Sequence, residues 1–285
     1  MKFIKTSLRI CCQNFRKWQT DYRIWTILIL LFTLVYEQTH DLASLGRNLG
    51  VKSSLWYYPF LYSQYHMKLI FTLPLLMVFC NAPFIDDNAM FIIVRSKRKA
   101  WILGQIIYIV AVSAVYNLFI LFSVFVTSIP SAEISTNWGK LLNTISVSNA
   151  SLSAGYPFLS ASRFVITWFT PLQAVWFTFL LSWLMSIMIG MLVYFFNSIT
   201  NTKSVGVTVC SLIIIFSCYI EVFGNNKMLW FSPVSWCTLD KLDVGGKTSN
   251  PSFYYCIAFF LIIEVLLSMV LLAFNRKWIL DKAHR

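Results

Sequence analysis

The sequence is poor in charge. Only 12% of its 285 residues are Asp, Glu, Lys or Arg, against roughly 25% in an ordinary soluble domain. It contains 11 acidic residues and three histidines, while 58% of its residues are hydrophobic. With a mean hydropathy of +0.68, this composition excludes a chain that folds wholly in water. We therefore expect an integral membrane protein.

The motifs of metal sites, hydrolases and nucleotide-binding enzymes are also missing. Acids and a histidine at 37–41, with His66, make a weak ligand set that lacks zinc-protease spacing, so we expect no metal. Residues 245–248 (GGKT) end like a phosphate loop, but Lys241 stands where that pattern requires glycine. No Ser, His and Asp grouping lies within the apolar runs. We expect neither an enzyme nor a cofactor on this chain.

The seven cysteines do not make a disulfide framework, because most lie near the N-terminus or inside apolar runs. Only Cys237 and Cys256 lie where they could meet outside the membrane, and their pairing stays open. The net charge of +12 comes from basic residues in short loops, as in membrane proteins. Nucleic acid is therefore not an expected partner.

Residues 1–23 have the pattern of a basic amphipathic helix. Their apolar residues recur at steps of three and four, which places them on one helical face with basic residues opposite. This predicts an interfacial helix on an anionic leaflet; the alternative is an ordinary helix packed on a soluble domain. The predicted apolar face is Ile4, Leu8, Cys11, Phe15, Trp18 and Tyr22, and the basic side is Lys2, Lys5, Arg9, Arg16, Lys17 and Arg23.

Residues 24–285 are expected to form one domain of six transmembrane helices. A span needs about 20 apolar residues. The candidates are 24–42, 66–84, 101–127, 169–196, 204–223 and 253–274. The first is the weakest candidate, because the polar residues at 37–41 predict that its outer end is exposed to water.

The placement of basic residues predicts the topology. Of the 23 Lys and Arg, 15 lie in segments 1–23, 84–100, 197–203 and 275–285. We assign these segments, and so both termini, to the cytoplasm. The outer loops are then 43–65, whose Tyr and Trp residues should rest at the headgroup level, 128–168, and 224–251. The last contains an apolar piece, 228–236, that suits a partly re-entrant or interfacial segment.

Two acids fall within predicted spans. Glu264 lies near the middle of the last span, where we expect either an inter-helix hydrogen bond or a substrate contact. Glu221 lies at the outer end of the fifth and is expected to be half-solvated. No relay of protonatable groups for ion-coupled transport is visible, so energy has to come from elsewhere or the protein is passive.

Residues 83–101 (PFIDDNAMFIIVRSKRKAW) form the largest internal cytoplasmic segment. Acids at its start and bases at its end favour a short helix from Asp86 or Asp87 to about Lys97. Its six apolar residues, 89–94, cover every side of such a helix. Two interpretations stay open: the helix receives force from a cytoplasmic protein, or it is a connecting loop whose bases fix the topology.

The order of these elements resembles the permease subunits of ABC-2-type transporters. That family has a basic elbow helix, six spans, a coupling helix in the first cytoplasmic loop and a partly re-entrant segment before the last span. The junction after 83–101 resembles bacterial members, in which a basic cluster precedes a span that opens with Leu-Gly-Gln, here Leu103-Gly104-Gln105. The polar outer end of the first span departs from the pattern.

The resemblance implies an exporter in the bacterial plasma membrane. Two permease chains, identical or related, would pair with two copies of a separate ATPase that binds ATP and Mg. They would move an amphipathic or hydrophobic peptide, lipid or drug outward by alternating access, through a cavity lined by the second and fifth spans. A six-span sensor or immunity protein without an ATPase is the alternative.

The resemblance also assigns roles to residues. The coupling residues would be Asp86, Asp87, Met90, Phe91, Ile92, Ile93, Arg95, Lys97 and Arg98. The elbow residues would be Phe15, Arg16 and Trp18. The expected cavity residues are Phe71, Met77, Phe79, Thr208, Ile214 and Phe216, with Glu264.

Overall fold

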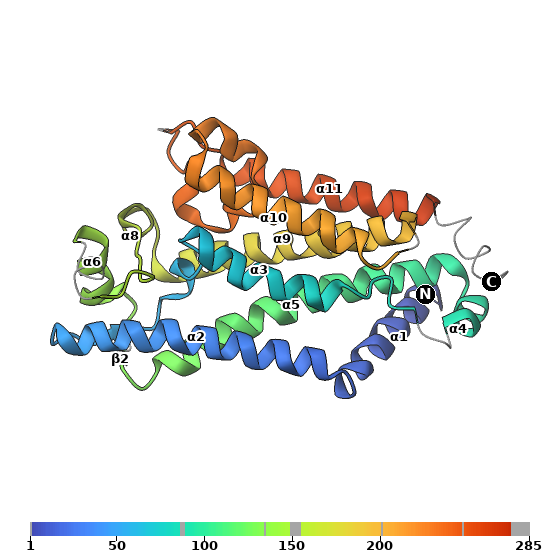
Figure 1. Cartoon of the computed structure of the whole chain (residues 1–285), viewed down its shortest axis with the longest axis horizontal. Helices are drawn as coiled ribbons and strands as arrows, with labels where there is room; N and C mark the ends of the chain where they lie inside the picture. Colours follow the sequence, from blue (N-terminus) through green and yellow to red (C-terminus); the bar gives the residue numbers. More distant parts are fainter. Residues whose placement is uncertain are drawn as a thin grey trace.

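The protein is an elongated, mostly helical bundle in the computed structural model (Figure 1), which describes residues 2–85, 89–133, 135–148, 155–200, 202–246 and 248–274. The long helices run along the longest axis. One end carries the start of α1, α4 and the last turns of α11, and we call it the terminal end; the other carries the short elements α6, α8 and β2.

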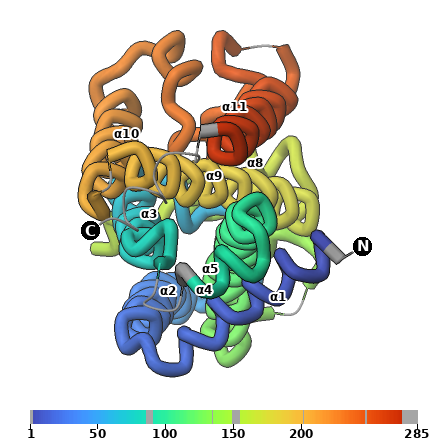
Figure 2. The backbone as a smooth tube through the Cα atoms, turned by 90° about the vertical axis from the view of Figure 1, so that its right-hand side faces the viewer, coloured from blue at the N-terminus to red at the C-terminus, as the bar shows by residue number. Residues whose placement is uncertain are grey.

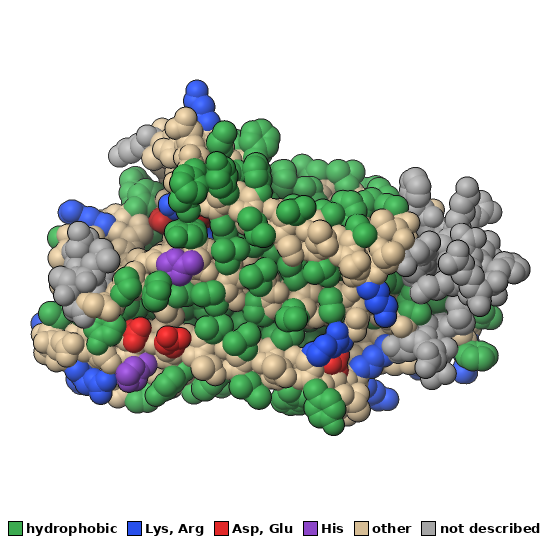
Figure 3. All heavy atoms as spheres, viewed as in Figure 1, with side chains coloured by type: hydrophobic (Ala, Val, Ile, Leu, Met, Phe, Trp, Pro, Cys, Tyr) green, Lys and Arg blue, Asp and Glu red, His purple; other side chains and the backbone are tan. Residues whose placement is uncertain are grey.

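Among the described residues, four helices are long and apolar enough to cross a membrane. They are α5 (Arg98–Ser128), α9 (Pro171–Thr200), α10 (Val205–Phe223) and α11 (Phe253–Phe274). They coincide with the last four predicted spans. On the face seen in Figure 3, charged side chains lie toward the two ends, and a hydrophobic band separates them. The chain is therefore a multi-pass membrane protein.

The first two predicted spans have a different form. Helix α2 (Tyr22–Asn48) has 27 residues and continues well past residue 42. Helix α3 (Tyr65–Phe79) has only 15 residues, which is about 22 Å of helix against a hydrocarbon core of about 30 Å. It ends early because the chain turns at Asn81 and Phe84 around Pro83, which cannot continue a helix. Six membrane crossings thus stay a prediction.

Helix α9 is the centre of the bundle. In Figure 2 it lies between α10 and α11 on one side and α3 and α5 on the other, and it contacts all four. Its most apolar stretch is 67% buried, against 17% for α11. A Cβ atom on Gly190 would lie 2.7 Å from Ile109 and 3.0 Å from Phe79. The glycine therefore allows α3, α5 and α9 to pack closely.

The end away from the termini is closed by short elements, which we call the cap. They are β1 (Ser53–Ser54), η2 (Tyr58–Phe60), β2 (Ala132–Glu133), α6 (Gly139–Val147), α8 (Arg163–Trp168), η3 (Asn226–Phe231), η4 (Ser235–Cys237) and η5 (Leu239–Lys241). Strands β1 and β2 pair in parallel, with Ser53 opposite Ala132. The cap joins outer loops that are far apart in sequence.

One prediction for the loops of this end needs correction. The aromatic residues of 43–65 do not simply rest at a membrane surface, because Tyr57, Tyr58 and Tyr62 are at most 2% exposed and belong to the core. The apolar piece 228–236 contains 3-10 turns, in which the buried Trp236 donates to the Leu229 carbonyl at 2.6 Å while Met228 and Phe231 are 54% and 76% exposed. Its partly re-entrant or interfacial position stays a prediction.

The terminal end of the bundle carries three short elements: α1 (Lys2–Arg16), η1 (Lys17–Gln19) and α4 (Ala89–Ser96). Helices α1 and α4 both pack on α5. Elsewhere, Cys237 and Cys256 are both buried and free, so the open question of their pairing is answered in the negative.

Candidate functional site

Helix α4 is a short helix that projects beside the start of α5. It has eight residues, and Lys97 joins it to α5 with a φ of 64°, a left-handed conformation that turns the chain sharply. Ile93 is 7% exposed and is part of the core, whereas Phe91 and Val94 are 77% and 82% exposed. One side of α4 is thus anchored to the protein, and an apolar side is bare.

The predicted coupling residues divide between these two sides. The described part of the helix starts at Ala89, and Asp86, Asp87 and the side chain of Met90 lie outside the described residues, so the predicted start of the helix stays a prediction. Ile92 is half-buried. Ile93 needs correction as a docking residue, because its side chain already packs on its own chain.

The basic residues of this segment surround the bare side. Arg95, Lys97 and Lys99 are exposed. Arg98 is half-buried as the first residue of α5. The described part of this corner combines an exposed apolar pair with three exposed cations, and is suited to a partner with a groove and an acidic rim.

Helix α1 lies along the first three turns of α5. Ser7 Oγ donates to the Ala100 carbonyl at 2.9 Å and Asn14 Nδ2 to Gln105 Oε1 at 2.8 Å, and Trp18 Nε1 of the adjoining η1 donates to the Tyr108 hydroxyl at 2.7 Å. A Cβ atom on Gly104 would lie 2.9 Å from Ile10 and from the Ser7 carbonyl oxygen. The Leu-Gly-Gln sequence therefore has a local structural role. Its glycine leaves room for α1 to approach α5, and its glutamine accepts a hydrogen bond from Asn14 of α1.

The buried face of α1 differs from the predicted apolar face. Ser7, Ile10, Cys11 and Asn14 are buried, but Ile4 and Leu8 are 58% and 48% exposed. The prediction of a single apolar face therefore needs correction: part of that face packs on α5, and the part with Ile4 and Leu8 is exposed. Whether the bare part lies on lipid stays a prediction.

The predicted elbow residues lie at the end of this contact. Phe15 and Trp18 are half-buried, and the Phe15 ring meets the Tyr108 ring edge-on at 5.0 Å. Arg16 is exposed and is the last residue of α1. The two aromatic residues thus anchor the junction between α1 and α2 to α5.

The predicted cavity residues divide between the core and the surface of the chain. None of them lines the pockets formed by α2, β1 and α5, by η1 and α2, or by α1, α5 and α11. The buried ones are Phe71, Phe79 and Ile214, and the exposed ones are Met77, Thr208 and Phe216. The first three need correction, because α3 and α10 pack on α9 and place them in the core.

Glu264 does not make the predicted inter-helix hydrogen bond in the described part of the chain. It lies in α11, its Oε1 atom is buried, and no described group donates a hydrogen bond to that atom. Its contact with substrate stays a prediction.

Sequence reasoning missed a buried ion pair between α3 and α10. The ammonium of Lys68 contacts the carboxylate of Glu221, and their side chains are 1% and 4% exposed. The expectation that Glu221 is half-solvated is therefore wrong. The sequence does place one base, Lys68, in the second predicted span and one acid, Glu221, at the end of the fifth. Nothing in the sequence shows that these two spans are neighbours in the bundle.

Neutral polar groups of the cap bond to α9 and to α10, the helix that carries Glu221. The Tyr58 hydroxyl lies 3.3 Å from Ser182 Oγ, and Ser232 Oγ donates to the Ser217 carbonyl at 3.3 Å. Burial raises the pKa of Tyr58 well above its ordinary value and raises the pKa of Cys237 to about 12. Both groups are therefore neutral, and they leave Lys68 and Glu221 to neutralise one another.

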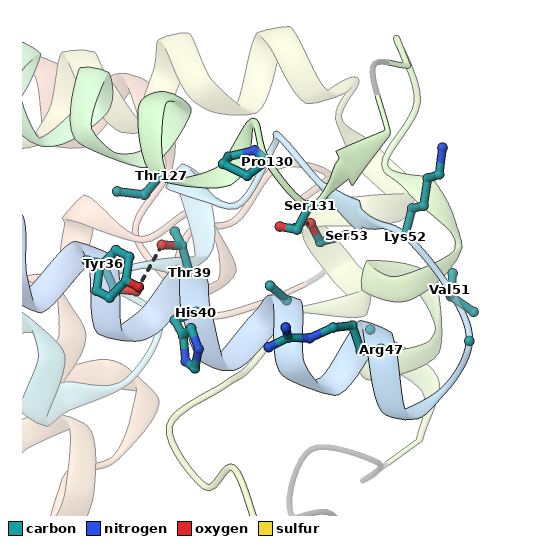
Figure 4. Close-up of a pocket in the computed structure, with 13 residues that line it drawn as sticks. Tyr36, Thr39, His40, Arg47, Val51, Lys52, Ser53, Thr127, Pro130 and Ser131 are labelled. Atoms are coloured by element: carbon teal, nitrogen blue, oxygen red, sulfur yellow. Dashed lines mark hydrogen bonds between the residues drawn. The ribbon is translucent and has the colours of Figure 1, made fainter.

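A polar pocket of about 560 Å³ opens between the outer part of α2, β1 and the end of α5 (Figure 4). Ser53 and Ser131 face each other in it, with their hydroxyls 3.0 Å apart. His40, Arg47 and Lys52 also line it. It explains the polar end of the first predicted span, and its cationic and hydroxyl groups suit a polar ligand. No cluster of three metal-ligating side chains occurs among the described residues.

Comparison of the chain with protein-family models, with curated proteins and with solved structures finds no match.

The ion pair predicts a non-additive pair of substitutions. Lys68→Met leaves the Glu221 charge buried without a partner, and should lower the free energy of unfolding by about 3–5 kcal/mol. Lys68→Met with Glu221→Leu should restore most of it, because an apolar pair replaces a buried ion pair at little cost. Denaturant titration in detergent micelles measures both. A double variant whose free energy of unfolding falls by the sum of the two single losses would contradict the buried ion pair.

The contact at Gly104 predicts a change in cysteine reactivity. Cys11 is 6% exposed while its neighbour Cys12 is exposed, so of these two cysteines a maleimide should label only Cys12 in the intact protein. Gly104→Leu should displace α1 and expose Cys11 as well, as read by peptide mass spectrometry. Gly50→Asn is the control, because nothing lies within 4 Å of that position and asparagine tolerates its positive φ. Protection of Cys11 in Gly104→Leu would refute this account of α1.

Proposed function

We propose that this chain is the transmembrane permease subunit of an ATP-driven exporter of the ABC-2 type. The observation that carries the proposal is the bare apolar side of α4. Phe91 and Val94 are three residues apart and almost fully exposed, on a helix whose other side is fixed by Ile93. Side chains at this spacing are the anchors with which a helix enters a groove on another protein.

The protein that carries this groove would be a cytoplasmic ATPase, and α4 would lie in the groove. The exposed cations Arg95, Lys97 and Lys99 would meet an acidic rim and orient the complex. ATP and Mg would be bound by the ATPase and not by this chain. The resemblance to the family supports this choice of partner, and it places the end with α1 and α4 in the cytoplasm of a bacterial cell.

The connection between α4 and the bundle is suited to transmit force. Helix α4 passes into α5 through one residue, Lys97, and α1 together with η1 braces the first turns of α5 with three hydrogen bonds. Helix α5 packs on α9, which contacts α3 and α10. A push on α4 would therefore tilt α5 and α1 together and reach both helices of the expected substrate path.

The substrate path would be completed by a second chain. Helices α3 and α10 expose apolar and aromatic side chains, among them Met77, Phe216 and Tyr219, with the hydroxyl of Thr208 nearby in α10. Two such faces, one from each permease, would enclose an apolar cavity for an amphipathic peptide, lipid or drug. This account takes α2 and α3 as the first two of six crossings.

The proposal predicts that the bare side of α4 is required for ATPase binding. Phe91→Asp with Val94→Asp should abolish co-purification of an ATPase subunit with the tagged chain, because both anchors become charged, while membrane insertion stays intact. The measurement is affinity purification from the native host, with mass spectrometry to identify a nucleotide-binding subunit and an assay of its ATP hydrolysis.

Val147→Asp is the matched control. Val147 is 69% exposed at the end of α6, in the cap, and should leave the complex unchanged. Equal recovery of the ATPase with the α4 variant would contradict the proposal. Absence of any ATPase with the unmodified chain would favour a sensor or immunity protein.

A further inference from the structure

The polar pocket between α2, β1 and the end of α5 is not part of the proposed substrate path (Figure 4). Its volume of about 560 Å³ lies within the range of about 300–1,000 Å³ that is usual for small-molecule sites. One wall is a stripe of α2 formed by Tyr36, His40, Ala43 and Arg47, which follow one another at steps of four and three and so share one helical face. The other wall comes from the chain around β1 and from the turn between α5 and β2.

Close backbone contacts fix the shape of this pocket. A Cβ atom on Gly46, near the end of α2, would lie 2.7 Å from the Val51 carbonyl oxygen. The Val51 amide donates to the Gly46 carbonyl at 2.8 Å, and the Ser53 amide donates to the Ser131 carbonyl at 3.1 Å. Gly50, with a φ of 66°, makes the left-handed turn that returns the chain toward α2. The pocket is therefore built into the folded cap.

The hydroxyl groups of the pocket offer acceptor lone pairs to a ligand. Thr39 and Ser53 line it and are 3% and 4% exposed. Thr39 Oγ1 donates to the Val35 carbonyl at 3.0 Å. Ser131 Oγ lies 3.0 Å from Ser53 Oγ and donates to the Ser128 carbonyl at 3.4 Å. Since a hydroxyl has one proton and two lone pairs, the protons are used within the protein, and the oxygens can accept from hydroxyl groups of a ligand.

The charged side chains that line the described part of this pocket are cations. Arg47 and Lys52 line it and are exposed. Arg47 donates to the neutral Ser44 hydroxyl at 3.0 Å, and no described acid makes an ion pair with either cation. Glu37 and Asp41 also lie on α2, but neither of them lines the pocket. Two cations are therefore available to a bound anion.

Other ligand classes fit the described lining less well. Glu133, at the end of β2, is exposed and does not line the pocket. The undescribed residues nearest in sequence, 134 and 149–154, have no ionisable side chain. His40 is the one imidazole among the described lining residues, and no described carboxylate joins it there, which disfavours a metal ion. An oxyanion is the charged group that these side chains favour.

We propose that the polar pocket binds a phosphate ester that carries hydroxyl groups, such as a glycerol phosphate unit. The guanidinium of Arg47 would hold the phosphate, because its planar N–H groups match an oxyanion in geometry, and Lys52 would supply the second positive charge. The ligand hydroxyls would donate to Ser53 and Ser131, which lie across the pocket from Arg47 in Figure 4. This unit occurs in soluble esters and in the headgroup of phosphatidylglycerol, and the pocket recognises the chemistry that they share.

Calorimetric titration of the purified full chain in detergent tests the proposal. The ligands are glycerol 3-phosphate, phosphatidylglycerol in the micelles, inorganic phosphate and glycerol. Arg47→Gln with Lys52→Gln should weaken binding of the phosphate esters at least about tenfold, because hydrogen bonds to a charged group are lost. Ser131→Ala should weaken glycerol 3-phosphate roughly fivefold, as expected for one neutral hydrogen bond, and leave inorganic phosphate unchanged.

Arg163→Gln with Lys227→Gln is the matched control, because it replaces the same two residue types at exposed cap positions that do not line the pocket. It should bind like the unmodified protein. A thermal unfolding midpoint equal to that of the unmodified protein, measured without ligand, shows that a variant has folded.

The titrations also separate the two sources of the ligand. Binding of glycerol 3-phosphate supports a soluble ester, and binding of phosphatidylglycerol without glycerol 3-phosphate supports a lipid headgroup. Failure of both esters to bind the unmodified protein would overturn the proposal. Equal affinity of the folded Arg47→Gln, Lys52→Gln variant and the control would also overturn it, as would glycerol that binds as tightly as glycerol 3-phosphate.

Discussion

The close approach of α1 to α5 at Gly104 is the constraint on which the terminal end of the protein depends. Because no side chain separates the helices there, the Asn14 amide reaches Gln105 and the Trp18 indole reaches Tyr108. That contact fixes where α2 begins. It also braces the turns of α5 from which α4 projects, so the exposed apolar pair of α4 is held at a defined position relative to the bundle.

Contacts between polar side chains also fix how the helices pack in the rest of the apolar bundle. In a membrane, a polar side chain is tolerated where another helix supplies its partner. Examples between helices are Asn14 with Gln105, Asn117 with Ser186 at 2.9 Å, and Lys68 with Glu221. Asn197 of α9 donates to the Ala82 carbonyl at 2.9 Å and accepts from the Gly206 amide of α10 at 2.8 Å. These bonds fix which helices are neighbours, whereas the apolar contacts between them are not directional.

Hydropathy predicted α5, α9, α10 and α11 to within a few residues, because a long apolar run in a chain with so few charged residues is expected to form a membrane-spanning helix. It could not predict the rotation of α1, since periodicity marks an apolar side but not the part of it that a neighbouring helix covers. Pairing of Lys68 with Glu221 depends on the packing of α3 against α10, which no local pattern encodes. The same holds for Tyr58, whose burial requires the cap. At the candidate site, the apolar run 89–94 predicted α4, and its link to α5 decided which side is bare.

The central claim is that α1, α4 and the start of α5 form one rigid unit. The most direct test is a pulsed electron paramagnetic resonance distance between spin labels at Leu8 and Val94, both exposed, with Cys12 and Cys80 replaced by serine. The account predicts a single narrow distance distribution in detergent and in lipid nanodiscs. A broad distribution, or one that differs between the two environments, would show that α1 and α4 move independently and would contradict it.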